Sequence, residues 1–420
     1  MKRGFYTIMA AQFCSSLADN ALFVAAVELL KADGAPGWQG AALVPMFALF
    51  YVALAPWVGA FADSQPKGRV MFISNAIKIV GCIMMFFHVH PLFAYAIVGL
   101  GAAAYSPAKY GILTEYLPHR LLVVANGWIE GLTVGAIILG VVIGGTLIQP
   151  GLAARLLSPD LPFIKLGIDS ISEIAIAITC FFYLLATLFN LYIPDTGVEH
   201  KKLHKNPLYL FQEFNRCMIL LWRDRLGQVS LAVTTLFWGA SATLQFIVIK
   251  WAEAALHLNL SKSSMLQGVV AIGVALGAAA AAKIVTLRQS VRVIPLGIAM
   301  GLIVLCMVFV SNLWVAIALL IIIGALAGFF VVPMNALLQH RGHQLMGAGH
   351  SIAVQNFNEN LSILVMTCLY YLMMQINLSI YWVITLFGLF VSGSMLLVKR
   401  RHEHNQRIQD DVIHLDDSTH

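Results

Sequence analysis

Long runs of hydrophobic residues, separated by short polar stretches, take up most of the chain. Each run has about 20 residues or more, the length that an α-helix needs to cross the hydrocarbon of a bilayer. Several runs are longer, which implies tilted or extended helices. The pattern predicts an all-α polytopic membrane protein. Its twelve transmembrane helices are expected at 5–30, 40–62, 70–89, 92–114, 122–148, 171–193, 228–252, 264–286, 293–311, 313–338, 347–375 and 378–398.

Composition agrees with this pattern, because 60% of the 420 residues are hydrophobic and only 11% are charged. Such values argue against a soluble globular protein, and no polar stretch is long enough for a soluble domain. The 6 cysteines show no paired spacing, so neither a disulfide framework nor a zinc site is predicted. No catalytic residue and no cofactor is predicted either.

Most of the 26 Lys and Arg residues fall in the loops on one side of the predicted membrane. The positive-inside rule assigns that side to the cytoplasm. Because the number of predicted spans is even, both termini are expected there. The formal net charge of +6 follows from this topology, so a nucleic-acid partner is not needed to explain it.

A polar central loop separates six predicted spans from six more, which is the outline of a duplicated transporter. The expected parts are an N-terminal six-helix bundle at 1–193, a cytoplasmic linker loop at 194–227, a C-terminal six-helix bundle at 228–398 and a cytoplasmic tail at 399–420. Together the bundles form two pseudo-symmetric halves.

A weak internal echo supports the duplication. Asn126 and Glu130 lie one helical turn apart in the fifth span, and Gln355 and Glu359 repeat this i, i+4 spacing in the eleventh. The fourth and tenth spans share a second short echo, around Pro107 and Pro333 in that order. Chance similarity is the alternative, since two short echoes are weak evidence.

The first span carries a polar stripe inside an otherwise apolar helix. Asp19 closes this stripe, which Gln12, Ser15 and Ser16 begin at helical spacing. A buried Asp costs roughly 2.5 to 3.5 kcal/mol at the centre of a membrane, so such residues usually face a bundle interior or an aqueous cavity and have a function. The stripe is therefore expected to face a cavity.

The ionisable residues within predicted spans also include Lys78, Lys109, Glu130 and Glu359. Each is a candidate functional group, and a structural ion pair is the alternative for each. Lys78 and Lys109 lie near predicted span ends, so a snorkelling side chain is a further alternative for these two. The histidines at 88, 90, 340 and 343 are expected in solvated loops.

The loop after the second span runs from Gly59 through Asp63 to Gly68 and Arg69. It resembles the Gly-x-x-x-Asp and Gly-Arg loop of the major facilitator superfamily, with two extra residues before Gly-Arg. In that family, the acid and the base form a latch at the cytoplasmic gate. A gate role for Asp63 and Arg69 is therefore predicted, and a plain polar turn is the alternative.

Over nearly its whole length, the sequence resembles the lysophospholipid transporters of that superfamily. The resemblance rests on Asp19-Asn20-Ala-Leu, on the run from Gly101 through Tyr105 and Lys109 to Leu113, on Leu236-Phe-Trp-Gly239, on Pro333-Met-Asn335 and on Gln355-Asn356 with Glu359-Asn360. It implies inward flipping of lysophosphatidylethanolamine and related lipids across the bacterial inner membrane. It also implies functional coupling to an acyltransferase-acyl carrier protein synthetase, which rebuilds the diacyl lipid.

The resemblance assigns substrate-binding roles. Asp19 and Glu359 would hold an ethanolamine ammonium, and Lys109 would hold the phosphate. The remaining expected substrate-binding residues are Asn20, Tyr105, Glu130, Asn335, Gln355 and Asn356. Relatives often carry a cation in the seventh span where this chain has Gln245, which leaves an anion-binding role there in doubt.

Three other functions stay open. A proton-coupled antiporter of amphipathic drugs would use Asp19 or Glu359 for the proton, but the antiporter glycine pattern in the fifth span has Val141 in place of proline. A lipid enzyme is disfavoured because no Gly-x-Ser-x-Gly or His-x-x-x-x-Asp motif occurs. A non-transporting scaffold for a lipid enzyme would keep its function when cavity residues are changed.

Overall fold

The computed structural model describes residues 3–147, 171–258, 260–409 and 412, and the part of the chain that it describes is helical without a β-strand. The loop predicted after residue 148 and most of the predicted tail beyond residue 409 lie outside the described residues. The helices at the predicted spans are α1 (Arg3–Ala32), α2 (Gly37–Ala53) with α3 (Ala55–Asp63), α4 (Lys67–Phe86), α5 (Pro91–Tyr116), α6 (Leu122–Leu147), α8 (Ile171–Leu191), α10 (Arg225–Ala255), α11 (Leu260–Ile284), α12 (Ile294–Leu305), α13 (Leu313–Met346), α14 (Ala348–Gln375) and α15 (Ile380–Ile408). Each predicted span thus coincides with a helix or a bent pair.

Ten helices among the described residues are long and apolar enough to cross a membrane. The pair α2 and α3, bent by 63°, makes an eleventh span. Pro56 in the first turn of α3 explains the bend, because proline lacks the N–H that would continue the ladder of α2. The remaining helix, α14, has 28 residues and coincides with the predicted eleventh span. Its polar stretch at 355–360 lowers its hydropathy.

Contacts divide the chain into two compact units, which are unit 1 (Met1–Ile112 and Gly135–Leu210) and unit 2 (Leu113–Val134 and Phe211–His420). Helix α6 is shared between them, since its first half belongs to unit 2 and its second half to unit 1. This division places 113–134 with the later helices, whereas the sequence assigned it to the first six. The division into two six-helix bundles stays a prediction.

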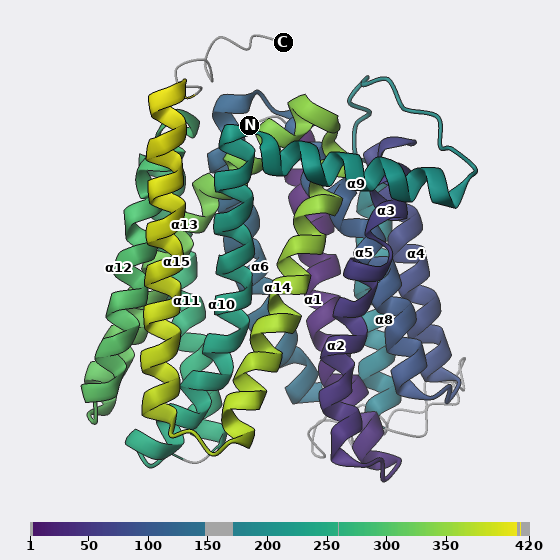
Figure 1. Ribbon diagram of the computed structural model, residues 1–420. Helices are drawn as coiled ribbons and strands as arrows, with labels where there is room; N and C mark the ends of the chain where they lie inside the picture. Colours follow the sequence, from purple (N-terminus) through teal and green to yellow (C-terminus); the bar gives the residue numbers. More distant parts are fainter. Residues whose placement is uncertain (1–2, 148–170, 259, 410–411, 413–420) are drawn as a thin grey trace. The chain divides into compact units, whose positions relative to one another are not determined.

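Unit 2 contains a helix that the sequence analysis placed in a loop. Helix α9 (Pro207–Arg223) lies across the direction of α10 (Figure 1). It packs against α14, since the Phe214 and Phe357 rings meet edge to face at 5.6 Å and the Asn358 amide approaches the Met218 sulfur at 3.1 Å. The linker is therefore partly an ordered element of unit 2.

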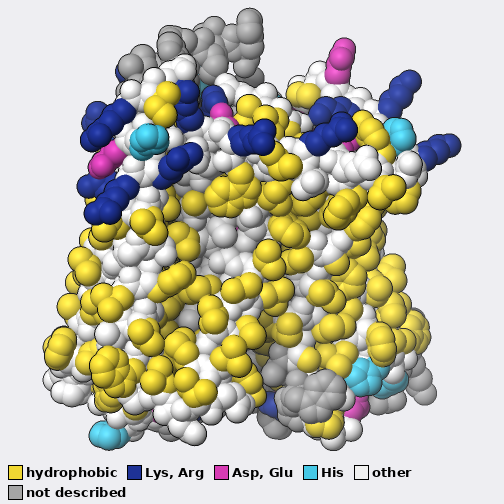
Figure 2. All heavy atoms as spheres, viewed as in Figure 1, with side chains coloured by type: hydrophobic (Ala, Val, Ile, Leu, Met, Phe, Trp, Pro, Cys, Tyr) yellow, Lys and Arg dark blue, Asp and Glu magenta, His cyan; other side chains and the backbone are white. Residues whose placement is uncertain are grey.

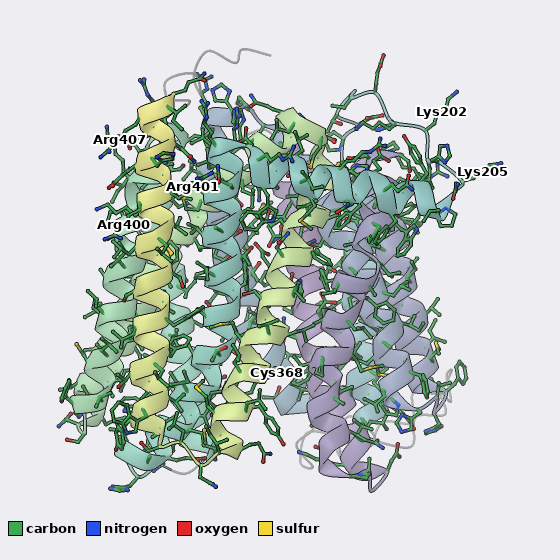
Figure 3. All side chains as sticks on the ribbon, in the orientation of Figure 1. Lys202, Lys205, Cys368, Arg400, Arg401 and Arg407 are labelled. Carbon is green, nitrogen blue, oxygen red and sulfur yellow. The ribbon has the colours of Figure 1, made fainter. Side chains whose placement is uncertain are left out.

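Two helices of unit 2 extend beyond their predicted ends. Helix α13 continues to Met346, and α15 continues to Ile408. Hydrophobic side chains cover the flank formed by unit 2, and Lys and Arg gather at the end where α15 terminates (Figure 2). Arg400, Arg401 and Arg407 lie on these last turns (Figure 3). The extension of α15 therefore carries charge out of the apolar zone.

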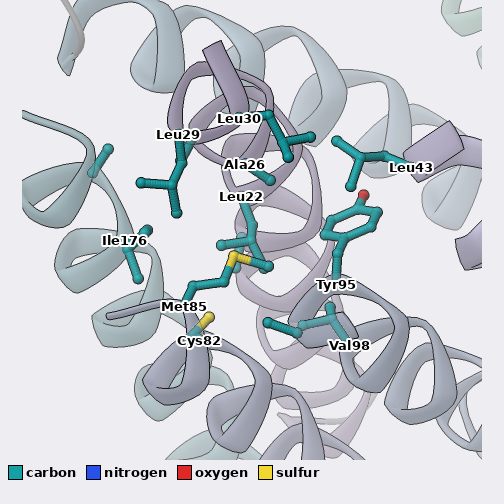
Figure 4. Packing of buried hydrophobic residues seen from close by; sticks show 14 of the residues in the cluster. Leu22, Ala26, Leu29, Leu30, Leu43, Cys82, Met85, Tyr95, Val98 and Ile176 are labelled. Atoms are coloured by element: carbon teal, nitrogen blue, oxygen red, sulfur yellow. The ribbon is translucent and has the colours of Figure 1, made fainter. Parts of the chain in front are cut away.

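The core of unit 1 is formed by α1, α4, α5 and α8 around residues that are almost fully buried. Leu22, Ala26, Cys82, Met85 and Val98 are among them (Figure 4). The small side chains on α1 let α8 pack closely against the helix region that carries the polar stripe, and α4 packs on α8 in turn. The apolar core thus holds the polar face of α1 in place.

Candidate functional site

The polar stripe of α1 ends in a buried ion pair in unit 1. The Lys78 ammonium on α4 donates to both oxygens of Asp19 at 2.9 Å. The Lys78 side chain is 1% exposed, whereas that of Asp19 is 23% exposed. Tyr183 on α8 also donates its hydroxyl to Asp19 at 2.6 Å. The Asp19 carboxylate is therefore matched in the interior by one cation and one hydroxyl donor.

The same ammonium is held by further groups. Ser15 accepts from Lys78 at 3.1 Å and donates to Asn75 at 2.9 Å. The ammonium also lies 4.9 Å from the centre of the Tyr105 ring. A Cβ at Gly101 would overlap the Lys78 stem, so glycine is needed at that point of α5. The snorkelling alternative does not hold for Lys78, because its ammonium is buried and pairs with Asp19.

Two other predicted residues of unit 1 have different surroundings. Asn20 donates to the Ser16 carbonyl of its own helix at 2.8 Å and is partly buried. Lys109 is buried, with its ammonium 4.7 Å from the centre of the Tyr110 ring. Asp19 therefore pairs with Lys78, although both lysines were open as partners from the sequence.

A second polar cluster lies in unit 2, on α13, α14 and α10. The Gln355 amide donates to Asn335 at 3.0 Å and to Glu359 at 2.7 Å. Thr234 on α10 lies beside Glu359 and donates its hydroxyl to the Leu231 carbonyl of its own helix at 3.2 Å. All of these side chains are buried. The i, i+4 spacing on α14 thus places the Gln355 amide and the Glu359 carboxylate next to each other on one face of the helix.

Glu130 and Asn356 complete the predicted residues of unit 2. Both are buried. The Asn360 side-chain amide donates to the backbone carbonyl of Asn356 at 2.9 Å. The two carboxylates that form the internal echo are therefore both buried within unit 2.

The predicted gate acid has a lysine as a partner. Asp63 at the end of α3 pairs with Lys67 at 3.0 Å, and both side chains are buried. Lys67 also donates to the Ala62 carbonyl at 2.6 Å. Arg69, the predicted base, is exposed. The gate roles of Asp63 and Arg69 stay predictions, and Lys67 joins them as a residue that the sequence analysis missed.

An amide pair joins the first half of α6 to α13 within unit 2. Asn126 and Gln339 exchange two hydrogen bonds at 2.8 and 2.9 Å. His340, next in the chain, lies with its ring 5.5 Å from that of His119 and is buried. The expectation of a solvated His340 was wrong, because α13 continues beyond the predicted span end.

Breaking this amide pair is expected to destabilise the protein. Asn126→Ala leaves the buried amide of Gln339 without its partner, which costs about 1 to 3 kcal/mol. We expect a lower midpoint of thermal unfolding in detergent, measured by the fluorescence of the purified protein. The double variant Asn126→Ala with Gln339→Leu should lose less than the sum of the single losses. Strict additivity would contradict a direct coupling.

No group of three or more His, Cys, Asp or Glu suited to a metal ion occurs among the described residues. The charged residues of the two polar clusters are Asp19 and Lys78 in unit 1 and Glu359 in unit 2.

The sequence pattern of the Major Facilitator Superfamily matches residues 8–367. The chain belongs to this superfamily. The fold agrees, since the human organic anion transporter MFSD10 superposes with a TM-score of 0.73 at 14% identity, over 96% of this chain and 100% of that one. The predicted all-α transporter fold is confirmed, and with it the expectation that the chain is not an enzyme.

Two relatives are similar over almost the whole chain. The lysophospholipid transporter LplT of Serratia proteamaculans is 41% identical over 377 residues, which cover 90% of each chain. The protein of the same name from Yersinia enterocolitica is 39% identical over 381 residues, covering 90% of this chain and 89% of its own. The resemblance found in the sequence is thereby confirmed.

Proposed function

We propose that this protein is a lysophospholipid transporter, which carries lysophosphatidylethanolamine and related lysophospholipids inward across the bacterial inner membrane. The observation that carries the proposal is the 41% identity, over 90% of each chain, to a transporter named for that substrate. The superfamily fold supports it, because such proteins move solutes through a path between helices rather than by covalent chemistry.

The orientation and cycle are part of the same proposal. The Lys and Arg asymmetry of the loops supports a cytoplasmic location for both termini. Transport proceeds by alternating access, and the imported lysolipid is re-acylated by an acyltransferase-acyl carrier protein synthetase to which the transporter is functionally coupled. Asp63 and Arg69 act at the cytoplasmic gate, and Lys67 neutralises Asp63 there.

The headgroup chemistry is suited to the ion pair of unit 1. A phosphoethanolamine group carries one positive and one negative charge. Asp19 accepts the ammonium, while the released Lys78, together with Lys109, attracts the phosphate. The exchange replaces one pair of opposite charges by two, so no charge is left uncompensated in the interior. The greater exposure of Asp19 than of Lys78 makes the carboxylate the group that the headgroup reaches first.

The polar cluster of unit 2 offers a second carboxylate to the ammonium. Glu359 is oriented by Gln355, which Asn335 holds in turn. The other proposed substrate-binding residues are Asn20, Tyr105, Glu130 and Asn356. The single acyl chain of the lysolipid lies against apolar side chains of the transporter.

A flux assay with the purified protein in liposomes tests the function. Lysophosphatidylethanolamine should cross protein-containing membranes faster than protein-free ones, and its mass should not change. Runs with and without a proton gradient separate facilitated flipping from proton coupling. Flux no faster than in protein-free liposomes would overturn the proposal.

Replacing Glu359 by the isosteric glutamine tests its role. Glu359→Gln is expected to lower lysophosphatidylethanolamine flux at least about tenfold, because an amide attracts an ammonium far less than a carboxylate does. Flux of lysophosphatidylglycerol, which has no ammonium, should fall less. The control is Glu253→Gln, which removes the carboxylate that pairs with Lys250 in the same unit and is more exposed than Glu359. Equal loss for both lipids would assign Glu359 a structural role only.

A further inference from the structure

A cavity of about 690 Å³ lies in unit 2, outside both polar clusters. Its walls come from the short helix η2 (Leu287–Val293), from the start of α12 and from the end of α15. The volume lies within the range of small-molecule sites in proteins. Nothing in the transport proposal uses it.

Helical periodicity aligns the polar side of this cavity. On α15, Lys399, His402, Glu403 and Gln406 lie on one face, and all of them line the cavity. The opposite side of α15 packs against α10, since Arg401 donates to Gln228 at 3.1 Å. On η2, residues three apart eclipse one another, which puts Gln289 and Arg292 together in the lining.

Among the lining residues that the structure describes, cationic side chains outnumber carboxylates. They are Arg292, Lys399 and Arg288, of which Arg288 has a further partner within the protein, and the carboxylate is Glu403. Glu403 pairs with Lys399 at 3.8 Å. Arg292 has no ion pair with any residue in the part of the chain that is described. A cavity of this kind attracts an anion, and the planar arginine forks fit phosphate oxygens in particular.

The place of the cavity favours a lipid rather than a soluble anion. It lies where α12 begins beside the last turns of α15, and these two helices meet closely about two turns further along, at Gly301 and Ser392. Exposed apolar side chains continue from it, with Leu302 two turns after the lining residue Pro295 and Leu396 one turn before Lys399. Acyl chains along this surface would bring a headgroup to the basic rim.

We propose that this cavity binds the phosphate headgroup of an anionic diacyl phospholipid of the surrounding leaflet. Arg288 and Arg292 hold the phosphate, and the polar side chains of Gln289 and Gln406 bind the rest of the headgroup. The lipid joins η2 to α15 and stabilises this end of unit 2. Basic cavities between transmembrane helices bind phosphate headgroups in this way.

The experiment uses the purified full-length chain in an uncharged detergent. Phosphatidylglycerol, phosphatidylcholine and sodium phosphate are titrated separately, and native mass spectrometry counts the bound lipid while thermal unfolding is followed. We expect phosphatidylglycerol to bind and to raise the unfolding midpoint, with phosphatidylcholine weaker because its choline offsets the charge. Equal stabilisation by sodium phosphate alone would overturn the lipid assignment in favour of a free anion. Since no transport is measured, failure here leaves the proposed function untouched.

Variants of matched charge identify the site. The double variant Arg288→Gln with Arg292→Gln is expected to weaken phosphatidylglycerol binding about 30-fold, because each cation near a charged lipid contributes about 1 kcal/mol. Arg400→Gln with Arg407→Gln removes the same charge from α15 outside the lining and should change binding less than about threefold. Glu403→Gln should strengthen binding, because it removes the carboxylate that competes for Lys399. Equal weakening by both double variants, or weaker binding by Glu403→Gln, would overturn the proposal.

Discussion

Lys78→Met is expected to cause a large loss of folded protein, because it leaves the Asp19 carboxylate inside the helix bundle without its cation. Removing one partner of a buried ion pair typically costs about 3 to 5 kcal/mol. The 23% exposure of Asp19 and its hydrogen bond from Tyr183 place the expected loss near the lower end, about 3 kcal/mol. The measurement is the amount of monodisperse protein after detergent extraction, together with its midpoint of thermal unfolding.

A double variant separates the structural and functional roles of this pair. Asp19→Asn with Lys78→Met removes both charges, so most of the lost stability should return. The double variant should nevertheless show no flux of lysophosphatidylethanolamine, because neither the Asp19 nor the Lys78 charge is left to pair with the headgroup. Lys31→Met, which removes the exposed partner of Glu28 at the end of α1, is the control and should change neither property. Full lysophosphatidylethanolamine flux in the double variant would contradict the proposed role of Asp19.

Gly277→Val is expected to disrupt the packing of unit 2. A Cβ at Gly277 on α11 would overlap the backbone carbonyl of Ala325 on α13. The same two helices also meet at Gly273, Gly324 and Gly328, where any Cβ would press on the partner backbone. Because backbone cannot rotate away as a side chain can, the helices must separate along the whole contact. The expected loss is about 3 kcal/mol or more, above the usual range for an overpacked core.

The control for this prediction lies on the same helix. Gly268→Val introduces the same side chain into α11, but no atom lies within 4 Å of a Cβ there. Both variants change helix propensity equally, so the difference between their unfolding midpoints reports the helix contact alone. Equal midpoints for the two variants would contradict the close approach of α11 and α13.

The spans could be predicted because a helix that crosses the membrane has a simple sequence pattern. Each helix that crosses hydrocarbon must be apolar over about 20 residues, and the order of such runs gave the twelve helices directly. Helix α9 was missed because its polar residues, such as Gln212, Asn215 and Arg216, interrupt a run that is too short for a span. It is helical because Phe214 and its neighbours bury one face against α14.

Glycines allow close helix contacts on several helices. On α6, a Cβ at Gly140 would overlap Leu17 of α1 and one at Gly144 would press on Val24, whereas Gly131 and Gly145 have no atom near a Cβ. The tightest backbone approach lies between α11 and α13, at Gly277 and Gly328. Glycine spacing shows that a close approach is allowed, but the partner helix decides where it occurs.

The sequence by itself determined that buried charges exist in this protein and on which helices they lie. Asp19, Glu130, Glu359, Lys78 and Lys109 were all found in this way, because a charge in an apolar run is conspicuous and costly. Their partners were decided only by the tertiary structure. The possible ion-pair partners of Asp19 were Lys78 and Lys109, and those of Asp63 were Lys67 and Arg69. Pairing depends on the rotation and the crossing of helices distant in sequence, and hydropathy records neither.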